Sequence, residues 1–340
     1  MSTMRAAVVR RFGEPIVIEE WPIPVPGKGE VLVKVAASGV CHTDLHAADG
    51  DWPIRPSLPL VPGHEGIGHV CAIGPGVADL REGDLVGVPW LHDACGACEW
   101  CLRGWETLCK RQHNTGYGVH GTHADYVIAR AAFAGRIPAT DDLAALAPVL
   151  CAGVTTYKGL IETGARPGEW VVISGVGGLG HVGVQYARAM GFRPIGLDTD
   201  ADKRALALAC GAEAAVDAAA TDAVDQIVAI TGGGAHGVLV TAASLPAFRT
   251  AIGVVRRGGT VALVGLPPGD MPLPIFDVVL KRITVRGSIV GTRADLEEAL
   301  GFAARGLVKP RVTTFPLDEA NAVFKQLRAG TVDGRAVLVP

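Results

Sequence analysis

The chain has 340 residues, a formal net charge of −3 and a hydrophobic fraction of 49%. This length predicts about two domains, and the composition provides enough apolar side chains for a sizeable core. No long lysine or arginine cluster occurs, which argues against nucleic acid or an anionic membrane surface as a partner. Glycine is abundant, with 45 residues, a share well above the usual figure of about 7%, and this favours many tight turns.

No apolar run of signal-peptide length follows the N-terminus, and no stretch reaches the ~18 uninterrupted apolar residues of a membrane span. We therefore expect a cytoplasmic protein without a membrane partner. The sequence contains eight cysteines. In a reducing compartment, metal ligation explains cysteines better than disulfides do.

The first 150 residues are predicted to be mostly β. Val-rich runs at 6–9 and 31–35 are separated by prolines and glycines, and further strands are expected between Val70 and Val88. The proline-rich stretch 53–62 is predicted to be an extended loop. Residues 92–123 combine four cysteines with glycines and histidines and show little periodicity. Something other than a hydrophobic core must therefore hold them together.

The pattern changes near Ala152, where strand-like runs begin to alternate with helical spacing. The expected strands are 170–174, one that ends at Asp198, 237–241 and 260–264. The expected helices are 178–190, 202–210, 246–255 and 293–305, and short strands are expected to close the chain. Such alternation predicts βαβ units and a parallel sheet.

A glycine-rich turn, Gly175-Val176-Gly177-Gly178-Leu179-Gly180, follows the first of these strands and opens a helix, and Asp198 ends the next strand. This context is typical of a dinucleotide site. The glycines let the backbone approach a pyrophosphate at the helix N-terminus, and the carboxylate accepts hydrogen bonds from the adenosine ribose. Because Asp198 would repel a 2′-phosphate and no arginine follows it immediately, we expect NAD rather than NADP. The alternative is a glycine-rich turn in a ligand-free α/β domain.

Four cysteines with the spacing Cys-x2-Cys-x2-Cys-x7-Cys lie in the irregular segment, namely Cys95, Cys98, Cys101 and Cys109. Four thiolates at this spacing can surround one zinc ion, and a site filled by four thiolates is structural. Disulfides and an iron–sulfur cluster are the alternatives. The ferredoxin run, however, places its fourth cysteine sooner and follows it with proline, whereas Lys110 follows here.

A second set of metal-binding residue types is dispersed. Cys41-His42-Thr43-Asp44-Leu45-His46 supplies a thiol, a hydroxyl, a carboxylate and two imidazoles, most of what metal-assisted proton removal requires. Gly63-His64-Glu65 and Cys151 offer further ligands, and two cysteines with one histidine leave a zinc position open. Spacing alone does not select these residues, because Cys71, Cys210 and the other histidines compete with them.

These motifs occur in one order along one chain, and together they closely resemble the zinc-dependent medium-chain alcohol dehydrogenases, most of all the bacterial and yeast-type members. The resemblance extends from about Met4 to Leu338. It implies an α/β protein in which residues 153–289 form a doubly wound, parallel-sheet Rossmann domain for NAD. Residues 1–152 and 290–340 would form a mostly β, GroES-like catalytic domain with a structural zinc lobe. It also implies a homotetramer.

The resemblance assigns roles near the metal. Cys41, His64 and Cys151 match the catalytic zinc ligands, and Glu65 matches a carboxylate that can enter the metal shell. Asp44 matches an acceptor that orients the ligand histidine. Thr43 matches the hydroxyl that bonds the substrate oxygen, and His46 matches the outer end of a proton relay.

It also implies contacts with the cofactor and the substrate. Besides the glycine-rich turn and Asp198, the expected cofactor contacts are His42, Thr155, Lys203, Val264, Leu266, Ser288, Val290 and Arg335. Bulky residues at Trp52 and Trp90, with Val290 at the inner end, imply a narrow pocket for small primary alcohols and their aldehydes. The other cysteines and histidines are expected to be core thiols and structural or surface imidazoles; they are Cys71, Cys210, His69, His92, His113, His120, His123, His181 and His236.

Alternative functions remain at this stage. A secondary-alcohol, aromatic-alcohol or polyol dehydrogenase of the same superfamily is the nearest. A zinc-free quinone reductase would lack the ligands, and a zinc hydrolase would have no use for the dinucleotide turn. A non-catalytic zinc and dinucleotide-binding scaffold is the alternative from another class.

Overall fold

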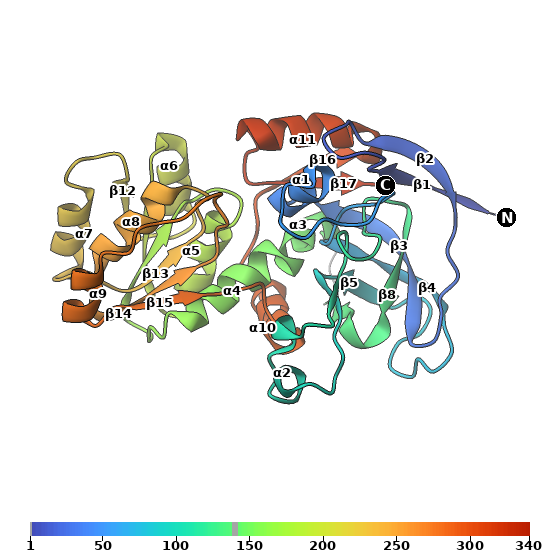
Figure 1. The fold of residues 1–340 in the computed structure, drawn as a ribbon, viewed down its shortest axis with the longest axis horizontal. Coiled ribbons are helices and arrows are strands. Elements are labelled where there is room, and N and C mark those ends of the chain that lie inside the picture. Colours follow the sequence, from blue (N-terminus) through green and yellow to red (C-terminus); the bar gives the residue numbers. More distant parts are fainter. Residues whose placement is uncertain (1, 138–141) are drawn as a thin grey trace. The chain divides into compact units, whose positions relative to one another are not determined.

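The computed structural model describes residues 2–137 and 142–340 and divides into two compact units (Figure 1). The first unit consists of Met1–Cys151, Thr292–Ala304 and Pro310–Pro340, and the second of Ala152–Gly291 and Arg305–Lys309. Each is described by itself.

The first unit is built on a mostly antiparallel seven-stranded sheet with the order β16-β17-β3-β4-β5-β9, in which β8 pairs with β3. Its strands are β3 (Glu30–Gly39), β4 (Gly66–Ile73), β5 (Leu85–Val88), β8 (Tyr126–Arg130), β9 (Gly135–Arg136), β16 (Val312–Pro316) and β17 (Arg335–Val339). Alternate residues of β3, namely Val31, Val33 and Val35, are buried in one core with residues of β4, β5 and β8. This is the period of two that a strand with one face on a core requires.

Smaller elements complete this unit. β1 (Thr3–Val8) and β2 (Val17–Pro22) form an antiparallel hairpin, and β6 (Leu91–Asp93) pairs with β7 (His113–Asn114). The helices are α1 (His42–Asp49), α2 (Glu99–Leu102), α3 (Leu143–Leu146), α10 (Arg293–Ala304) and α11 (Ala320–Ala329), with 3-10 turns at Glu106–Leu108, Ala131–Phe133, Ala147–Leu150 and Leu317–Glu319. Val323 and Phe324 of α11 are buried in the same core as Leu45 of α1.

The second unit contains a six-stranded sheet with the order β12-β11-β10-β13-β14-β15, and every described pair in it is parallel. The strands are β10 (Trp170–Ser174), β11 (Arg193–Asp198), β12 (Ala214–Asp217), β13 (Ala235–Val240), β14 (Val255–Leu263) and β15 (Thr284–Gly287). The helices are α4 (Ala152–Glu162), α5 (Gly180–Ala189), α6 (Ala201–Ala209), α7 (Ala223–Thr231), α8 (Leu245–Val254) and α9 (Ile275–Lys281). Val171, Val172 and Ile173 of β10 are fully buried, as expected for a parallel strand covered on both faces.

The predicted α/β class, with a parallel Rossmann-type sheet and a separate β-rich region, is confirmed. The expectation that only short strands follow the helix near 293–305 was incomplete. Helix α11 lies between β16 and β17, and its Val323, Phe324 and Leu327 pack on one core at helical spacing. Among the described residues, no single helix is long and apolar enough to cross a membrane, although the two helical segments 143–150 and 152–162 pass that test as a bent pair.

Candidate active site

A buried carboxylate organises the start of α1. Asp44 lies in the first turn of this helix and is fully buried. Its Oδ2 accepts the backbone N–H of Cys41 at 2.8 Å, and its Oδ1 accepts that of Gly63 at 3.0 Å. The Nδ1 atom of His64 lies 3.1 Å from the same Oδ1. Asp44 therefore fixes the ring of His64 and leaves its Nε2 lone pair available.

Four potential metal ligands converge beside this carboxylate. One ligand atom from each of Cys41, His64, Glu65 and Cys151 lies within 4.8 Å of the others, and all four residues are buried. The two Sγ atoms are 3.9 Å apart. His64 Nε2 has no hydrogen-bond partner among the described residues, which is costly for a buried polar atom unless a ligand satisfies it. Two thiols, an imidazole and a carboxylate are donors that suit zinc, so these residues fit the expected metal.

The electrostatics of the cluster are coupled. The hydrogen bond with Cys151 holds the pKa of the Cys41 thiol well below its usual range, whereas the same contact, together with burial, raises the pKa of Cys151. Burial alone would raise the pKa of Asp44, but the imidazoles of His64 and His123 outweigh it and hold that pKa well below its usual range. Asp44 is therefore an ionised acceptor for the ring of His64.

Arg335 forms a buried ion pair with Glu65. The guanidinium donates a hydrogen bond to Glu65 Oε1, and Arg335 and Glu65 are 3% and 0% exposed. Burial raises the pKa of Glu65, although the charge of Arg335 acts in the opposite direction. Sequence reasoning treated these residues separately, as a pyrophosphate contact and a carboxylate near the metal. In the first unit they form one pair, and a carboxylate joined to arginine is a weaker candidate for a permanent metal ligand than the two cysteines.

The expected proton-relay residues lie on α1. Thr43 Oγ1 is 3.7 Å from Cys41 Sγ, which places the hydroxyl beside the cluster. His46 Nδ1 lies 2.9 Å from a carboxylate oxygen of Asp51. Asp51 was not among the predicted site residues. It follows the candidate relay residue His46 by five positions, and an acidic residue so near in sequence could have suggested a partner for this histidine. His42, the first residue of the helix, keeps much of its surface exposed, and the partial burial of its ring lowers the pKa of the imidazole.

Aromatic rings adjoin these polar residues. Trp90 packs edge-on against the ring of His64, with centroids 5.2 Å apart, and Trp52 stacks on His46 at 4.9 Å. Tyr117 lies between the two indoles, 5.4 Å from Trp52 and 5.8 Å from Trp90. Its hydroxyl donates to the carbonyl oxygen of Ile54 at 2.6 Å. The structure thus places Trp90 against the metal-ligand cluster and Trp52 against His46, and it adds Tyr117, which no local motif marks.

The four-cysteine lobe holds its thiols together. The four Sγ atoms of Cys95, Cys98, Cys101 and Cys109 all lie within 4.8 Å of one another. Cys101 Sγ is 3.6 Å from Cys98 Sγ and 3.9 Å from Cys95 Sγ. Backbone N–H groups point at the sulfurs, as from Cys98 to Cys95 at 3.3 Å. A backbone hydrogen bond from Ala97 lowers the pKa of Cys95 to about 6, so this thiol readily becomes the thiolate that a metal requires.

The glycine-rich turn of the second unit keeps space for a ligand. A Cβ on Gly180 would lie 1.8 Å from the carbonyl oxygen of Gly175, so only glycine permits this turn, whereas a Cβ on Gly177 would meet nothing within 4 Å. Asp198 Oδ2 accepts the N–H of Val176 at 2.7 Å, which joins the acidic residue to the turn. Gly178 and Leu179 complete the turn before α5 begins at Gly180.

The remaining predicted cofactor contacts lie elsewhere in the second unit. The hydroxyl oxygens of Thr155 and Ser288 are buried without a hydrogen-bond partner in the described chain, which fits a missing polar ligand. Lys203 lies in the first turn of α6. Val264 and Leu266 follow β14, with Leu266 66% exposed. Val290 has φ 43°, an unusual conformation for a β-branched residue, and such strain is often found at ligand sites.

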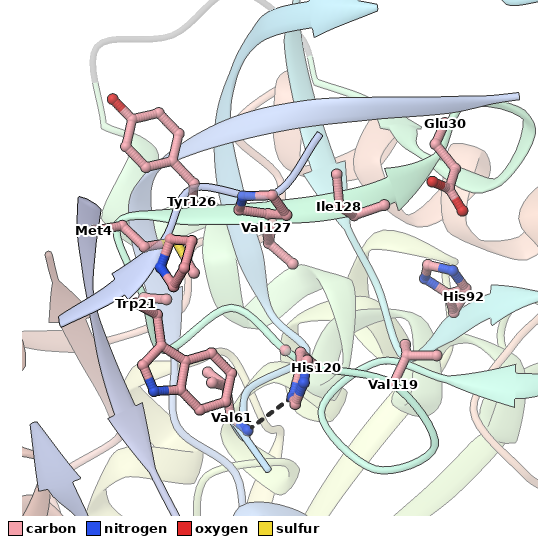
Figure 2. A pocket seen from close by; sticks show the side chains of 14 residues that line it. Met4, Trp21, Glu30, Val61, His92, Val119, His120, Tyr126, Val127 and Ile128 are labelled. Atoms are coloured by element: carbon pink, nitrogen blue, oxygen red, sulfur yellow. Dashed lines mark hydrogen bonds between the residues drawn. The ribbon is translucent and has the colours of Figure 1, made fainter. Parts of the chain in front are cut away.

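A separate cavity of about 240 Å³ lies elsewhere in the first unit. Figure 2 shows Trp21 and His120 on one side of it, with the N–H of Val61 bonded to His120, and His92 and Glu30 on the other. Its lining includes none of the four residues of the dispersed metal-ligand cluster. This cavity is therefore not the predicted substrate pocket, and the imidazoles that line it were expected to be structural.

Comparison with known families decides the class of this site. Residues 27–139 match the alcohol dehydrogenase GroES-like domain, and residues 178–305 match the zinc-binding dehydrogenase family. The chain belongs to the zinc-binding alcohol dehydrogenases. It is 59% identical to an alcohol dehydrogenase of Rhizobium meliloti over 336 residues, which cover 99% of this chain and 98% of the relative.

Solved structures have the same fold. A putative zinc-binding dehydrogenase of Sinorhizobium meliloti bound to NADP aligns with a TM-score of 0.91 and 29% identity, covering 100% of both chains. An acetophenone reductase of Geotrichum candidum in complex with NAD aligns with a TM-score of 0.88 and 29% identity, covering 99% of this chain and 97% of the other. This alcohol dehydrogenase therefore shares its whole length with enzymes crystallised with either cofactor.

We predict that Cys101→Ser removes one of two zinc ions per chain and lowers the thermal midpoint, because three thiolates hold zinc more weakly than four and the lobe has no core of its own. Metal analysis of the purified variant checks this. Cys71→Ser is the matched control, since Cys71 lies outside both clusters and is exposed, so the expectation of a core thiol at this position was wrong. Equal zinc contents in the two variants would contradict a structural zinc site here.

Proposed function

We propose that this alcohol dehydrogenase oxidises small primary alcohols to aldehydes, and reduces them in reverse, with NAD as hydride acceptor and zinc as the activating metal. The observation that carries the proposal is the buried cluster of Cys41, His64 and Cys151 with an unpartnered Nε2 atom and the Thr43 hydroxyl beside it. A structural zinc site would not need the Thr43 hydroxyl beside its ligands or the imidazole of His46 on the same helix.

Each residue of the candidate site in the first unit has a role in the proposed reaction. Zinc, when bound, acts as a Lewis acid that lowers the pKa of an alcohol oxygen. Cys41, His64 and Cys151 would hold the metal, a three-residue ligand set that in zinc enzymes leaves a position for substrate, and Asp44 keeps the His64 ring oriented. Thr43 would accept a hydrogen bond from the substrate hydroxyl and release its own hydroxyl proton as it takes up that of the substrate. His46, held by Asp51, would form the outer end of the path, where a proton is exchanged with solvent.

NAD is the favoured cofactor because of Asp198. Its carboxylate is held against the glycine-rich turn by the Val176 N–H, where a second negative charge from a 2′-phosphate would be repelled. Nη1 of Arg204 in α6 donates to the carbonyl oxygens of Asp198 and Thr199, at 3.1 and 2.9 Å, and lies 3.4 Å from Asp217 Oδ1, so part of its hydrogen-bonding capacity and charge is already used within the protein. The unpartnered hydroxyls of Thr155 and Ser288 support a polar ligand in the same unit.

Small substrates are favoured by the aromatic rings near the metal cluster. Trp90 touches the ring of His64, and Tyr117 fills the space between Trp90 and Trp52. Such rigid walls favour a short, unbranched alcohol over a bulky secondary alcohol or a polyol. Benzyl alcohol is the aromatic alternative, and a non-catalytic scaffold is the alternative from another class.

A homotetramer in the cytoplasm completes the proposal. On α9 of the second unit, Ile275, Phe276 and Val279 are 71%, 78% and 66% exposed. The adjacent β15 ends its sheet, and β14 is its only described strand partner. An exposed apolar helix beside a free strand edge favours coverage by a second copy of the chain, which sedimentation equilibrium measures directly. The eight free cysteines fit a reducing compartment.

Thr43→Ala is predicted to lower kcat by about 10²-fold or more, because no other described side chain on α1 offers a hydroxyl at this position. Zinc content should remain that of the parent chain. Thr43→Ser, which keeps the hydroxyl, is the control and should retain most activity. Unchanged turnover in the alanine variant would exclude Thr43 from the proton path.

Steady-state rates over primary, secondary, aromatic and polyol substrates, each with NAD and with NADP, test the proposed function. We expect kcat/KM to be highest for short primary alcohols with NAD, and activity to disappear with a zinc chelator. Trp90→Ala should shift the preference towards bulkier alcohols. Preference for a polyol, equal use of NADP, or an unaltered ranking in the tryptophan variant would contradict the corresponding part of the proposal.

A further inference from the structure

His123 is a fully buried imidazole that belongs to the environment of the proposed metal site. It lies in the loop before β8, far along the chain from Cys41 and His64. Its Nε2 lies 3.4 Å from Asp44 Oδ2, and its Nδ1 lies 2.8 Å from the hydroxyl oxygen of Ser38. Sequence reasoning had treated this residue as one of several structural or surface imidazoles.

The loop that carries His123 is bonded to the loop that carries His64. The N–H groups of Gly121, Thr122 and His123 donate to the carbonyl oxygens of Val61, Gly63 and Pro62, at 2.7, 3.0 and 3.0 Å. A Cβ on Gly63 would lie 2.6 Å from His123 Nδ1. The ring of His123 thus packs directly on the backbone that precedes His64, so a shift of one loop moves the other.

The hydrogen bonds around the ring determine which nitrogen carries the proton. Ser38 Oγ lies 2.7 Å from Thr122 Oγ1, so the two hydroxyls and His123 Nδ1 form a chain. A proton on Nδ1 alone would turn the Nε2 lone pair towards the carboxylate of Asp44, which is repulsive. If Thr122 donates to Ser38 and Ser38 donates to Nδ1, the proton is on Nε2 and points at Asp44. This arrangement pairs Nδ1 with Ser38 and turns the N–H of Nε2, which has no other partner among the described residues, towards Asp44.

Both carboxylate oxygens of Asp44 then face N–H groups. Oδ1 receives the N–H of Gly63 and faces Nδ1 of His64, while Oδ2 receives the N–H of Cys41 and faces Nε2 of His123. The N–H dipole of Nε2 then favours the orientation of the carboxylate in which Oδ1 faces His64. The 3.4 Å contact is longer than an ordinary hydrogen bond, so it acts through this dipole and through packing.

We propose that His123 is a positioning residue for the metal ligand His64, and that it acts through Asp44 without touching the metal or the substrate. This inference rests on the proposed zinc site. Groups of this kind behind a ligand histidine typically change metal affinity by about 10–100-fold when they are removed. The alternative is that the ring only fills space beside Phe324, whose ring centroid is 6.3 Å away.

Two substitutions separate these roles. His123→Phe keeps the ring volume and removes both nitrogens, whereas His123→Gln loses the ring but places an amide N–H where Nε2 lies. We expect the phenylalanine variant to release its chelatable zinc at least about tenfold faster than the parent chain, and the glutamine variant to resemble the parent. A space-filling role predicts the reverse order.

The measurement is the rate at which a chelating dye removes zinc, followed by analysis of the zinc that remains in the four-cysteine lobe. His120→Phe is the control, since this imidazole lies in the same loop and bonds Val61 rather than Asp44. Release from the phenylalanine variant at the parent rate, or release from the glutamine variant as fast as from phenylalanine, would overturn the inference.

A third variant covers the case in which His123→Phe does not fold. Ser38→Ala removes the donor to Nδ1 and frees the ring to adopt the other tautomer, so zinc release should again accelerate; an unchanged rate would overturn the inference. A parent chain without chelatable zinc would contradict the proposed function and this inference together. A zinc-containing parent whose variants all release zinc at one rate would contradict the inference alone.

Discussion

The carboxylate of Asp44 is the constraint on which the first unit's chemistry depends. A buried charge is costly unless several donors surround it, and here these donors come from three separate segments: Cys41, Gly63-His64 and His123. Folding that satisfies the charge therefore brings the metal ligands together. Cys151 joins them at the end of a 3-10 turn whose residues are all buried, so packing as well as hydrogen bonding holds the ligands near one another.

Features that are local in the chain could be predicted from sequence. The four cysteines of the lobe lie within a short segment, and their spacing alone indicates one tetrahedral site. The glycine-rich turn follows a buried strand and opens a helix, and both features are visible in the sequence. Its glycines are required because a Cβ on Gly180 would collide with the carbonyl of Gly175. The parallel sheet could be predicted from its central strands, such as β10 and β13, which are buried on both faces and whose apolar runs are visible without tertiary information.

Features that depend on tertiary contact could not be predicted in this way. Nothing near Arg335 indicates that it pairs with Glu65, and nothing near Tyr117 indicates that it lies between two tryptophans. Nothing in the sequence distinguishes His123 from the other histidines; only the tertiary structure shows that its loop is hydrogen-bonded to the loop of His64. Even the dispersed zinc ligands were selected by resemblance to a family rather than by spacing, because Cys71, Cys210 and other histidines were equal candidates.

The central claim is that Cys41, His64 and Cys151 hold a zinc ion that serves alcohol oxidation. Anomalous diffraction at the zinc absorption edge, from crystals of enzyme shown to be active, tests it most directly. The account predicts two peaks per chain, one enclosed by the four lobe cysteines and one coordinated by the two Sγ atoms and His64 Nε2. An active preparation whose crystals show zinc only in the lobe would contradict it.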